Sequence, residues 1–143
     1  MRDAVQVRCQ RHHEAATLPR VSQDGDVAAD LFACEAIEVP ARGRALVPTG
    51  IALELPEGFR ARIHARSGLS WKHGIETGAG LIDQGFRDPI GVLLYNHTDA
   101  PYAVQLGDRI AQLCIERYSH PTFEEVEAIA PTGRSAGWGS SGR

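Results

Sequence analysis

Short runs of alternating apolar and polar residues dominate this chain, and each run stops at turn-forming residues. Ile51, Leu53 and Leu55 alternate with alanine and glutamate before a Pro-Glu-Gly turn at 56–58. A period of two places every second side chain on the same face of a strand, whereas an amphipathic helix needs a period near 3.6. The pattern therefore predicts a fold built almost entirely of short β-strands.

Four further segments support this prediction. Residues 59–66 place apolar side chains on one face and three arginines and a histidine on the other. Residues 90–95 are almost continuously apolar, which predicts a strand covered on both sides. Residues 102–106 and 109–116 alternate again. Short strands joined by Gly, Pro and Asp turns are typical of a β-barrel or a jelly roll.

One segment departs from the period of two, namely residues 67–74 with the sequence SGLSWKHG. Ser67 is a suitable N-cap, Lys72 and His73 suit the negative end of a helix, and Gly74 can adopt the left-handed conformation that ends one. We therefore expect a single short helix here.

Length and composition fit one ordinary folded domain. The chain has 143 residues, of which 43% are hydrophobic and 23% charged. The net charge of −3 argues against general nucleic-acid binding, which needs a basic excess. No run approaches the roughly 18 apolar residues of a membrane helix, and the first residues do not look like a signal peptide. We expect a cytoplasmic protein that binds neither membrane nor nucleic acid.

The cysteines and histidines show no metal-binding spacing. Cys9, Cys34 and Cys114 are odd in number and far apart, and they lack the paired spacing of a zinc site. We expect reduced thiols, and we interpret all six histidines as structural or surface residues.

Arg66 and Ser67 stand where a predicted strand gives way to the predicted helix. Backbone N–H groups, a hydroxyl and a guanidinium can converge on one anion at such a junction. Arg-Ser-Gly is a common tripeptide, however, and a plain helix cap explains Ser67 equally well. Both interpretations stay open on these residues alone.

The stretch 78–87, GAGLIDQGFR, combines glycines, a carboxylate, an aromatic ring and an arginine. Gly78 and Gly80 on either side of Ala79 would let a ligand approach the backbone closely, and 84–85 can form the tip of a hairpin. A flat ring can lie against such a hairpin. The alternative is a bulged hairpin whose Phe86 fills the core.

The end of the chain, GWGSSG at 137–142, formally matches the pattern G-x-G-x-x-G. A dinucleotide site also needs a helix after these glycines, and none can follow here. Trp138 is unexpected in a solvated tail, which indicates that the tail closes over something.

Five segments in this order resemble the five motifs of the trimeric dUTPase family: VAADLFA at 27–33, ARSGLSWKHG at 65–74, GAGLIDQGFR at 78–87, GDRIAQL at 107–113 and AGWGSSG at 136–142. The resemblance implies an all-β, distorted jelly-roll barrel with one short helix. It also implies a homotrimer, with residues 1–132 as the single domain and 133–143 as a flexible arm exchanged between subunits.

The resemblance implies a magnesium-dependent enzyme that hydrolyses dUTP to dUMP and pyrophosphate by water attack on the α-phosphorus. Such an enzyme removes dUTP from the nucleotide pool and supplies dUMP for thymidylate synthesis. Asp83 matches the catalytic carboxylate that orients and deprotonates the water. Asp30 matches the aspartate that holds hydrated Mg²⁺.

The remaining matched positions are implied to bind the substrate. Phe86 stands where the family usually has tyrosine, packed on the deoxyribose. The implied substrate-binding residues are Arg66, Ser67, Gly68, Thr77, Gly78, Ala79, Gly80, Leu81, Ile82, Phe86, Gly91, Gln112, Arg134, Trp138, Gly139 and Ser140.

Several positions depart from the usual form of the family. Ala28 replaces a glycine, Ala65 replaces a proline, and Arg134 lies one residue later than the usual arginine of the arm. Two other functions compete with the main one. The chain could be a dUTPase-like protein with weak catalysis that binds a regulatory partner, or a relative of dCTP deaminase.

Overall fold

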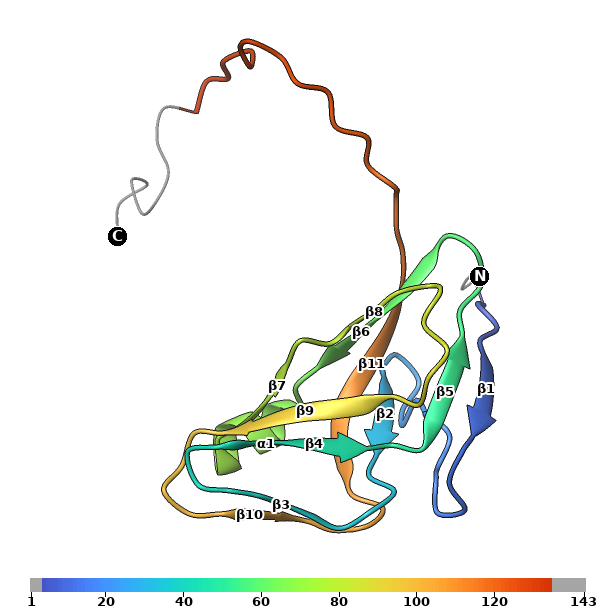
Figure 1. The fold of residues 1–143 in the computed structure, drawn as a ribbon, viewed down its shortest axis with the longest axis vertical. Helices are drawn as coiled ribbons and strands as arrows, with labels where there is room; N and C mark the ends of the chain where they lie inside the picture. The colour runs from blue at the N-terminus through green and yellow to red at the C-terminus, as the bar shows by residue number, and fades with distance from the viewer. Residues whose placement is uncertain (1–3, 135–143) are drawn as a thin grey trace.

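A computed structural model describes residues 4–134, and within this range the chain forms eleven β-strands and one short helix (Figure 1). The prediction of a nearly all-β protein with one short helix is confirmed. The strands are β1 (Arg8–Arg11), β2 (Ala29–Phe32), β3 (Ile37–Val39), β4 (Arg44–Pro48), β5 (Ile51–Glu54), β6 (Phe59–His64), β7 (Ile75–Gly78), β8 (Leu81–Ile82), β9 (Gly91–Asn96), β10 (Tyr102–Val104) and β11 (Arg109–Arg117). The helix is α1 (Ser67–His73).

The strands form two main antiparallel sheets. One has the order β2-β11-β6-β8 and the other the order β4-β9-β7, while β1 pairs with β5 and β10 with β3. Figure 1 shows β4 and β9 running across the direction of β6 and β11. The core lies between these layers, and its largest fully buried side chains are Leu31, Ile51, Ile75, Leu94 and Ile110.

β9 is covered less than its sequence predicts. Its side chains alternate between buried and half-buried, so that Leu94 is 1% exposed while Leu93 and Tyr95 are partly accessible. The predicted strand covered on both sides is therefore wrong for the single chain. Only one face of the strand packs on the core, and the other face carries apolar side chains outward.

The helix begins one residue earlier than its sequence signals suggest. Arg66, with extended backbone, holds the N-cap position, and no side chain caps the helix there, so the prediction of Ser67 as N-cap is wrong. The predicted stop is confirmed, because Gly74 has φ 62° and its N–H donates to the carbonyls of Leu69 and Ser70.

After β11 the chain leaves the body. Figure 1 shows the segment that follows Arg117 extending away from the sheets. Tyr118 still contacts the body, because its N–H donates to the Gly58 carbonyl, but residues 119–134 are all exposed. Within residues 4–134, no helix is long and apolar enough to cross a membrane.

Asn96, at the end of β9, is the most heavily bonded buried polar side chain of the fold. It is 2% exposed, and its amide nitrogen donates to the carbonyls of Val39 (3.2 Å) and Ala100 (2.8 Å). Its amide oxygen accepts hydrogen bonds from the N–H (2.9 Å) and hydroxyl (2.8 Å) of Thr98. Asn96 therefore joins β9 to β3 and to the turn before β10.

The substitution Asn96→Ala leaves these buried partners unsatisfied. We expect it to lower the free energy of unfolding by roughly 2–4 kcal/mol, measured by urea denaturation at a fixed protein concentration. His97→Ala is the control, since its exposed contact with the Glu76 carboxylate contributes little to stability. Equal effects of the two substitutions would contradict this role of Asn96.

Candidate active site

A polar cleft of about 590 Å³ brings together five of the predicted site residues. These residues lie far apart in the sequence. They meet here because β11 pairs with both β2 and β6. β2 carries the carboxylate, β11 the glutamine, and the chain that leaves β6 carries the arginine and the start of α1. The five residues are Asp30, Arg66, Ser67, Gly68 and Gln112.

One carboxylate faces two guanidinium groups in this polar cleft. The Asp30 side chain is 12% exposed, its Oδ1 lies 3.6 Å from Nε of Arg66, and its Oδ2 lies 3.7 Å from Nη1 of Arg109. The hydroxyl of Ser22 donates to Asp30 at 2.6 Å. The positive charge of two arginines, the Ser67 hydroxyl and the amide of Gln112 suit a polyanion such as a chain of phosphates.

Arg109 also lines the polar cleft, although no sequence motif predicts a role for it. A strict period of two would put this side chain on the same face as Ala111 and Leu113, which point into the core. The pairing of β11 with β2 instead shifts register between Arg109 and Ala111. Such a bulge re-aims a side chain, and it turns Arg109 into the cleft while Ile110 is buried.

A second, smaller pocket of about 200 Å³ lies under the glycine-containing segment 78–80. It is lined by Ile63, Ala79, Gly80, Leu81, Ile82, Asp83, Phe86, Ile90 and Gly91, seven of which are predicted site residues. Thr77 and Gly78 precede this lining on β7. Phe86 is 41% exposed, so the alternative in which it fills the core is wrong.

The predicted hairpin at this pocket is wrong in its pairing. β7 pairs with β9 and β8 pairs with β6, so the chain turns a corner from one sheet to the other at Ala79 and Gly80. Both residues have positive φ, 53° and 98°. A Cβ on Gly80 would lie 3.0 Å from the Ile63 carbonyl oxygen, so only glycine fits against β6. We call residues 78–81 the glycine corner.

Asp83 lies just after β8 with an exposed side chain, at the start of a tight turn. The N–H of Phe86 donates to the Asp83 carbonyl at 3.0 Å. The next residue, Gln84, accepts a hydrogen bond of 2.8 Å from the hydroxyl of Tyr118. The carboxylate is therefore accessible, and it stands on a turn that these two hydrogen bonds hold.

One protomer does not bring Asp83 to the polar cleft. The two pockets share no lining residue, and β2 and β8 form opposite edges of the four-stranded sheet. β8 is antiparallel to β6 with Arg62 opposite Leu81, which places Asp83 level with Arg60, six residues before Arg66. At about 3.3 Å per residue, this separation is roughly 20 Å. The chain therefore holds two separate groups of predicted site residues, which we call the two half-sites.

Part of the predicted arm can be located. Arg134 is exposed, and its N–H donates to the hydroxyl of Thr132 at 3.3 Å. Trp138, Gly139 and Ser140 lie outside the residues that the structure describes.

The polar cleft suits Mg²⁺ only as an ion that is bound together with a phosphate ligand. Within residues 4–134, no group of three metal-ligating side chains lies in this cleft, and Asp30 is engaged by two arginines. Mg²⁺ keeps several water molecules and is commonly bound through one or two carboxylates plus substrate phosphates. One carboxylate that is 12% exposed, beside two guanidinium groups suited to phosphate, matches that description.

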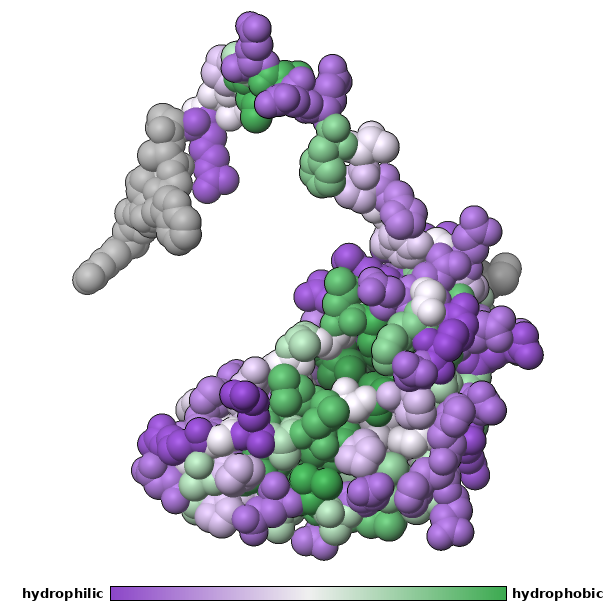
Figure 2. Space-filling model, viewed as in Figure 1, coloured by the Kyte–Doolittle hydropathy of each residue, from purple (hydrophilic) through white to green (hydrophobic). Residues whose placement is uncertain are grey.

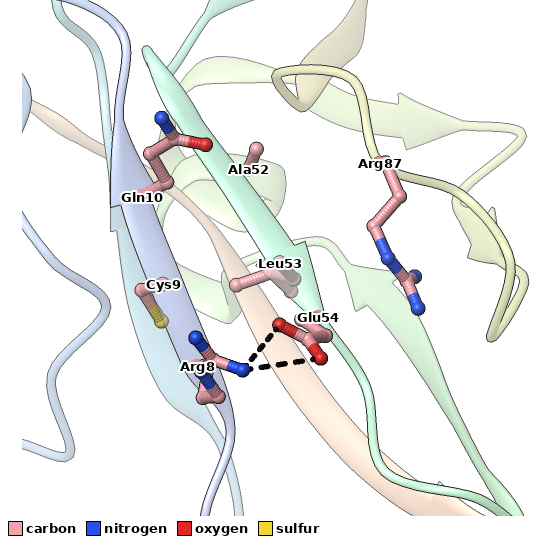
Figure 3. Close-up of a pocket in the computed structure, with 7 residues that line it drawn as sticks. All are labelled: Arg8, Cys9, Gln10, Ala52, Leu53, Glu54 and Arg87. Carbon is pink, nitrogen blue, oxygen red and sulfur yellow. Dashed lines mark hydrogen bonds and ion pairs between the residues drawn. The ribbon is translucent and has the colours of Figure 1, made fainter.

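Another pocket, of about 310 Å³, lies along β1 and β5 (Figure 3). Figure 3 shows the Arg8 guanidinium paired with the Glu54 carboxylate, 3.1 Å apart, beside Cys9. None of the predicted site residues lines this pocket. We therefore assign it no part in the site.

Comparison with known proteins gives one family. Residues 14–142 match the family model for dUTPase. The chain is 47% identical over 130 residues to the deoxyuridine 5'-triphosphate nucleotidohydrolase of Arabidopsis thaliana, covering 90% of this chain and 78% of the relative. It is 43% identical to a probable deoxyuridine 5'-triphosphate nucleotidohydrolase of Schizosaccharomyces pombe, covering 93% and 96% of the two chains.

Solved structures of dUTPases resemble this chain in fold. A variant of the dUTPase of Staphylococcus bacteriophage 80alpha, solved with dUpNHpp, has a TM-score of 0.89 and 25% identity, covering 96% of this chain and 98% of that one. A variant dUTPase from phage phi11 of S. aureus, described for its coordination of a structural Mg(II) ion, has a TM-score of 0.80 and 23% identity over 86% and 97% of the chains. The fold is thus the distorted jelly roll of these proteins, as expected.

Arg109 provides a test of the polar cleft. We expect Arg109→Ala to weaken binding of inorganic tripolyphosphate about tenfold or more in calorimetry at low salt, because one charge-assisted contact is lost. Arg8→Ala is the matched control, since Arg8 pairs with a carboxylate outside the cleft. Native affinity in Arg109→Ala, or the same loss in Arg8→Ala, would show that the cleft is not the phosphate site.

Proposed function

This chain belongs to the dUTPase family and is a dUTP diphosphatase, which hydrolyses dUTP to dUMP and pyrophosphate, and we propose that the two half-sites form its active site. The observation that carries this proposal is the gathering of Asp30, Arg66, Ser67, Gly68 and Gln112 in one polar cleft. The matching half is the glycine corner with Asp83 beside it.

The polar cleft binds the triphosphate. Arg66 and Arg109 neutralise its charge, while the Ser67 hydroxyl, the Gly68 backbone and Gln112 fix its position. Asp83 orients a water molecule towards the α-phosphorus and accepts its proton, so that pyrophosphate leaves in line. Holding the reactants in this geometry supplies much of the rate enhancement.

Mg²⁺ is the proposed cofactor, and when bound it neutralises the charge that develops on the leaving pyrophosphate. Asp30 would hold the hydrated ion. Arg66 and Arg109 balance the Asp30 charge and hold this carboxylate in the cleft, where its side chain is 12% exposed.

The glycine corner reads the base. Uracil lies against the backbone of Thr77 to Ile82, where amides and carbonyls match its edge. Cytosine presents an amine to the wrong partner, and an unpaired buried polar group can lower the specificity constant by roughly 10⁴-fold. The small space leaves no room for the methyl group of thymine. Phe86 and Gly91 lie beside the deoxyribose, and the Phe86 ring excludes a 2′-hydroxyl.

The complete enzyme is proposed to be a homotrimer, with each active site built from the polar cleft of one subunit and the glycine corner of another. The separation of roughly 20 Å between Asp83 and Arg66 within one chain supports this assembly. Exposed apolar side chains support it too, because Leu46 on β4 and Leu81 on β8 are 63% and 60% exposed. Figure 2 shows hydrophobic side chains gathered in a band across the body, over the region where Figure 1 draws β8, β9 and β4.

Residues 133–143 are proposed as the arm that closes over the site, with residues 1–132 as the domain that carries it. Trp138 stacks on uracil, Gly139 and Ser140 follow the nucleotide, and Arg134 reaches the γ-phosphate. The extended, exposed path of residues 119–134 supports an arm that reaches beyond its own subunit.

In the cell, this activity removes dUTP from the nucleotide pool and supplies dUMP for thymidylate synthesis. We place the protein in the cytoplasm, although one relative, from Dictyostelium discoideum, is a mitochondrial deoxyuridine 5'-triphosphate nucleotidohydrolase that is 42% identical to this chain.

Asp83→Asn tests the chemistry. We expect it to lower the turnover of dUTP by about 10²–10⁴-fold, because the general base is lost, and to leave dUTP affinity and trimer mass unchanged. Pyrophosphate release with Mg²⁺, and nucleotide binding by calorimetry, measure the two effects. Asp88→Asn, on an exposed loop nearby, is the control. Unchanged turnover in Asp83→Asn would favour a regulatory binding protein over an enzyme.

Mixed trimers test where the site lies. Asp83→Asn and Arg66→Ala chains are each expected to be inactive as pure trimers. When equal amounts are unfolded and refolded together, a quarter of the sites, roughly, combine an intact cleft with an intact corner from a different subunit. We therefore expect about a quarter of the activity of refolded native enzyme. No recovery from properly mixed trimers would place both halves in one subunit.

A further inference from the structure

The outward face of the sheet β2-β11-β6-β8 carries three metal-binding side chains that the proposed hydrolysis does not use. They are His64 on β6, and Cys114 and Glu116 on β11. One ligand atom from each residue lies within 4.8 Å of the other two. A nitrogen, a sulfur and an oxygen donor thus meet at one place on the sheet.

Strand register brings these residues together. Gln112 lies opposite His64, and Cys114 lies opposite Arg62, so His64 and Cys114 are diagonal neighbours on one face. Glu116 lies two residues beyond Cys114 and shares its face. No local sequence pattern signals this group, because the histidine and the cysteine come from strands far apart in the chain.

The donor atoms are available. Among residues 4–134, the two ring nitrogens of His64 have no hydrogen-bond partner, and the sulfur of Cys114 has none either. Glu116 is paired with Arg60 (3.3 Å) and Arg62 (4.0 Å), but both arginines contact the same oxygen, Oε2. The other oxygen, Oε1, remains for a ligand while the arginines keep Oε2.

A second group of similar composition lacks an available histidine nitrogen. In the group His13, Cys34 and Glu35, Nδ1 of His13 accepts a hydrogen bond from the N–H of Ala15 at 3.0 Å. The neutral ring then carries its proton on Nε2, which lies 4.0 Å from the Glu35 carboxylate. No nitrogen of His13 is left to bind a metal, so the two groups differ in chemistry despite their similar composition.

We propose that His64, Cys114 and Glu116 bind a divalent cation of the zinc class, with water as the fourth ligand. Zinc bonds of about 2.0–2.3 Å separate ligand atoms by roughly 3.3–3.8 Å in a tetrahedron, so small side-chain rotations close the site. Thiolate and imidazole donors select zinc over magnesium, which prefers oxygen ligands. The site is therefore distinct from the proposed magnesium site at Asp30.

Metal binding changes the state of the thiol. Burial raises the pKa of Cys114, the Glu116 carboxylate raises it further, and Arg62 lowers it. The cation displaces the thiol proton and takes up the charge of the resulting thiolate. The bound metal would also tie β6 to β11 at His64, two residues before Arg66 and next to the polar cleft.

The test is titration of the full-length protein, without a histidine tag, with Co²⁺ in the presence of excess Mg²⁺. Thiolate coordination produces a near-ultraviolet sulfur-to-cobalt charge-transfer band, and tetrahedral geometry produces intense visible bands. We expect about one Co²⁺ per protomer, displaced by Zn²⁺. Circular dichroism checks that each variant is folded.

Variants identify the ligands. We expect Cys114→Ala to abolish the charge-transfer band, and His64→Ala, at an exposed position, to weaken Co²⁺ binding tenfold or more. Cys9→Ala is the matched control, because this exposed thiol lies beside Arg8 and Gln10 with no histidine in its pocket (Figure 3). No band in the native protein, or a band that survives in Cys114→Ala and disappears in Cys9→Ala, would overturn the proposal. Neither readout depends on dUTP hydrolysis.

Discussion

The pairing of β11 with β2 on one side and β6 on the other is the constraint on which the rest of the structure depends. β11 is the longest strand, and its two neighbours deliver Asp30 and the chain that leads to Arg66 to either side of Gln112. Its inward side chains, Ala111 and Leu113, anchor the same strand in the core. Because stability and the polar cleft share this strand, errors in its register would damage both together.

The charges in the polar cleft are arranged to hold each other in place. Asp30 lies between two arginines that would otherwise repel one another, and its low exposure strengthens both attractions. The Arg66 guanidinium also donates to the Arg109 carbonyl at 3.2 Å, which fixes its orientation further. A site preorganised in this way spends less binding free energy on ordering long side chains when a phosphate chain arrives.

The sequence predicted the strands, the helix and its glycine stop because alternation and turn chemistry are local properties. The ordered motifs predicted the members of the polar cleft, from Asp30 to Gln112, and these residues do meet. Arg109, the pairing of the glycine corner and the group around Cys114 were missed. Each of these depends on a bulge or on the register between strands distant in the chain, which no local pattern records.

The glycine corner has a consequence for how this protein can evolve. Its contacts to a base would come from backbone atoms, which every residue type possesses, while Ala79 and Gly80 hold positive φ angles that few side chains tolerate. Most single substitutions there would either leave the presented atoms unchanged or disturb the fold. Single substitutions would thus rarely change the base preference. A different base preference would need an insertion or deletion that changes the path of the backbone at this corner.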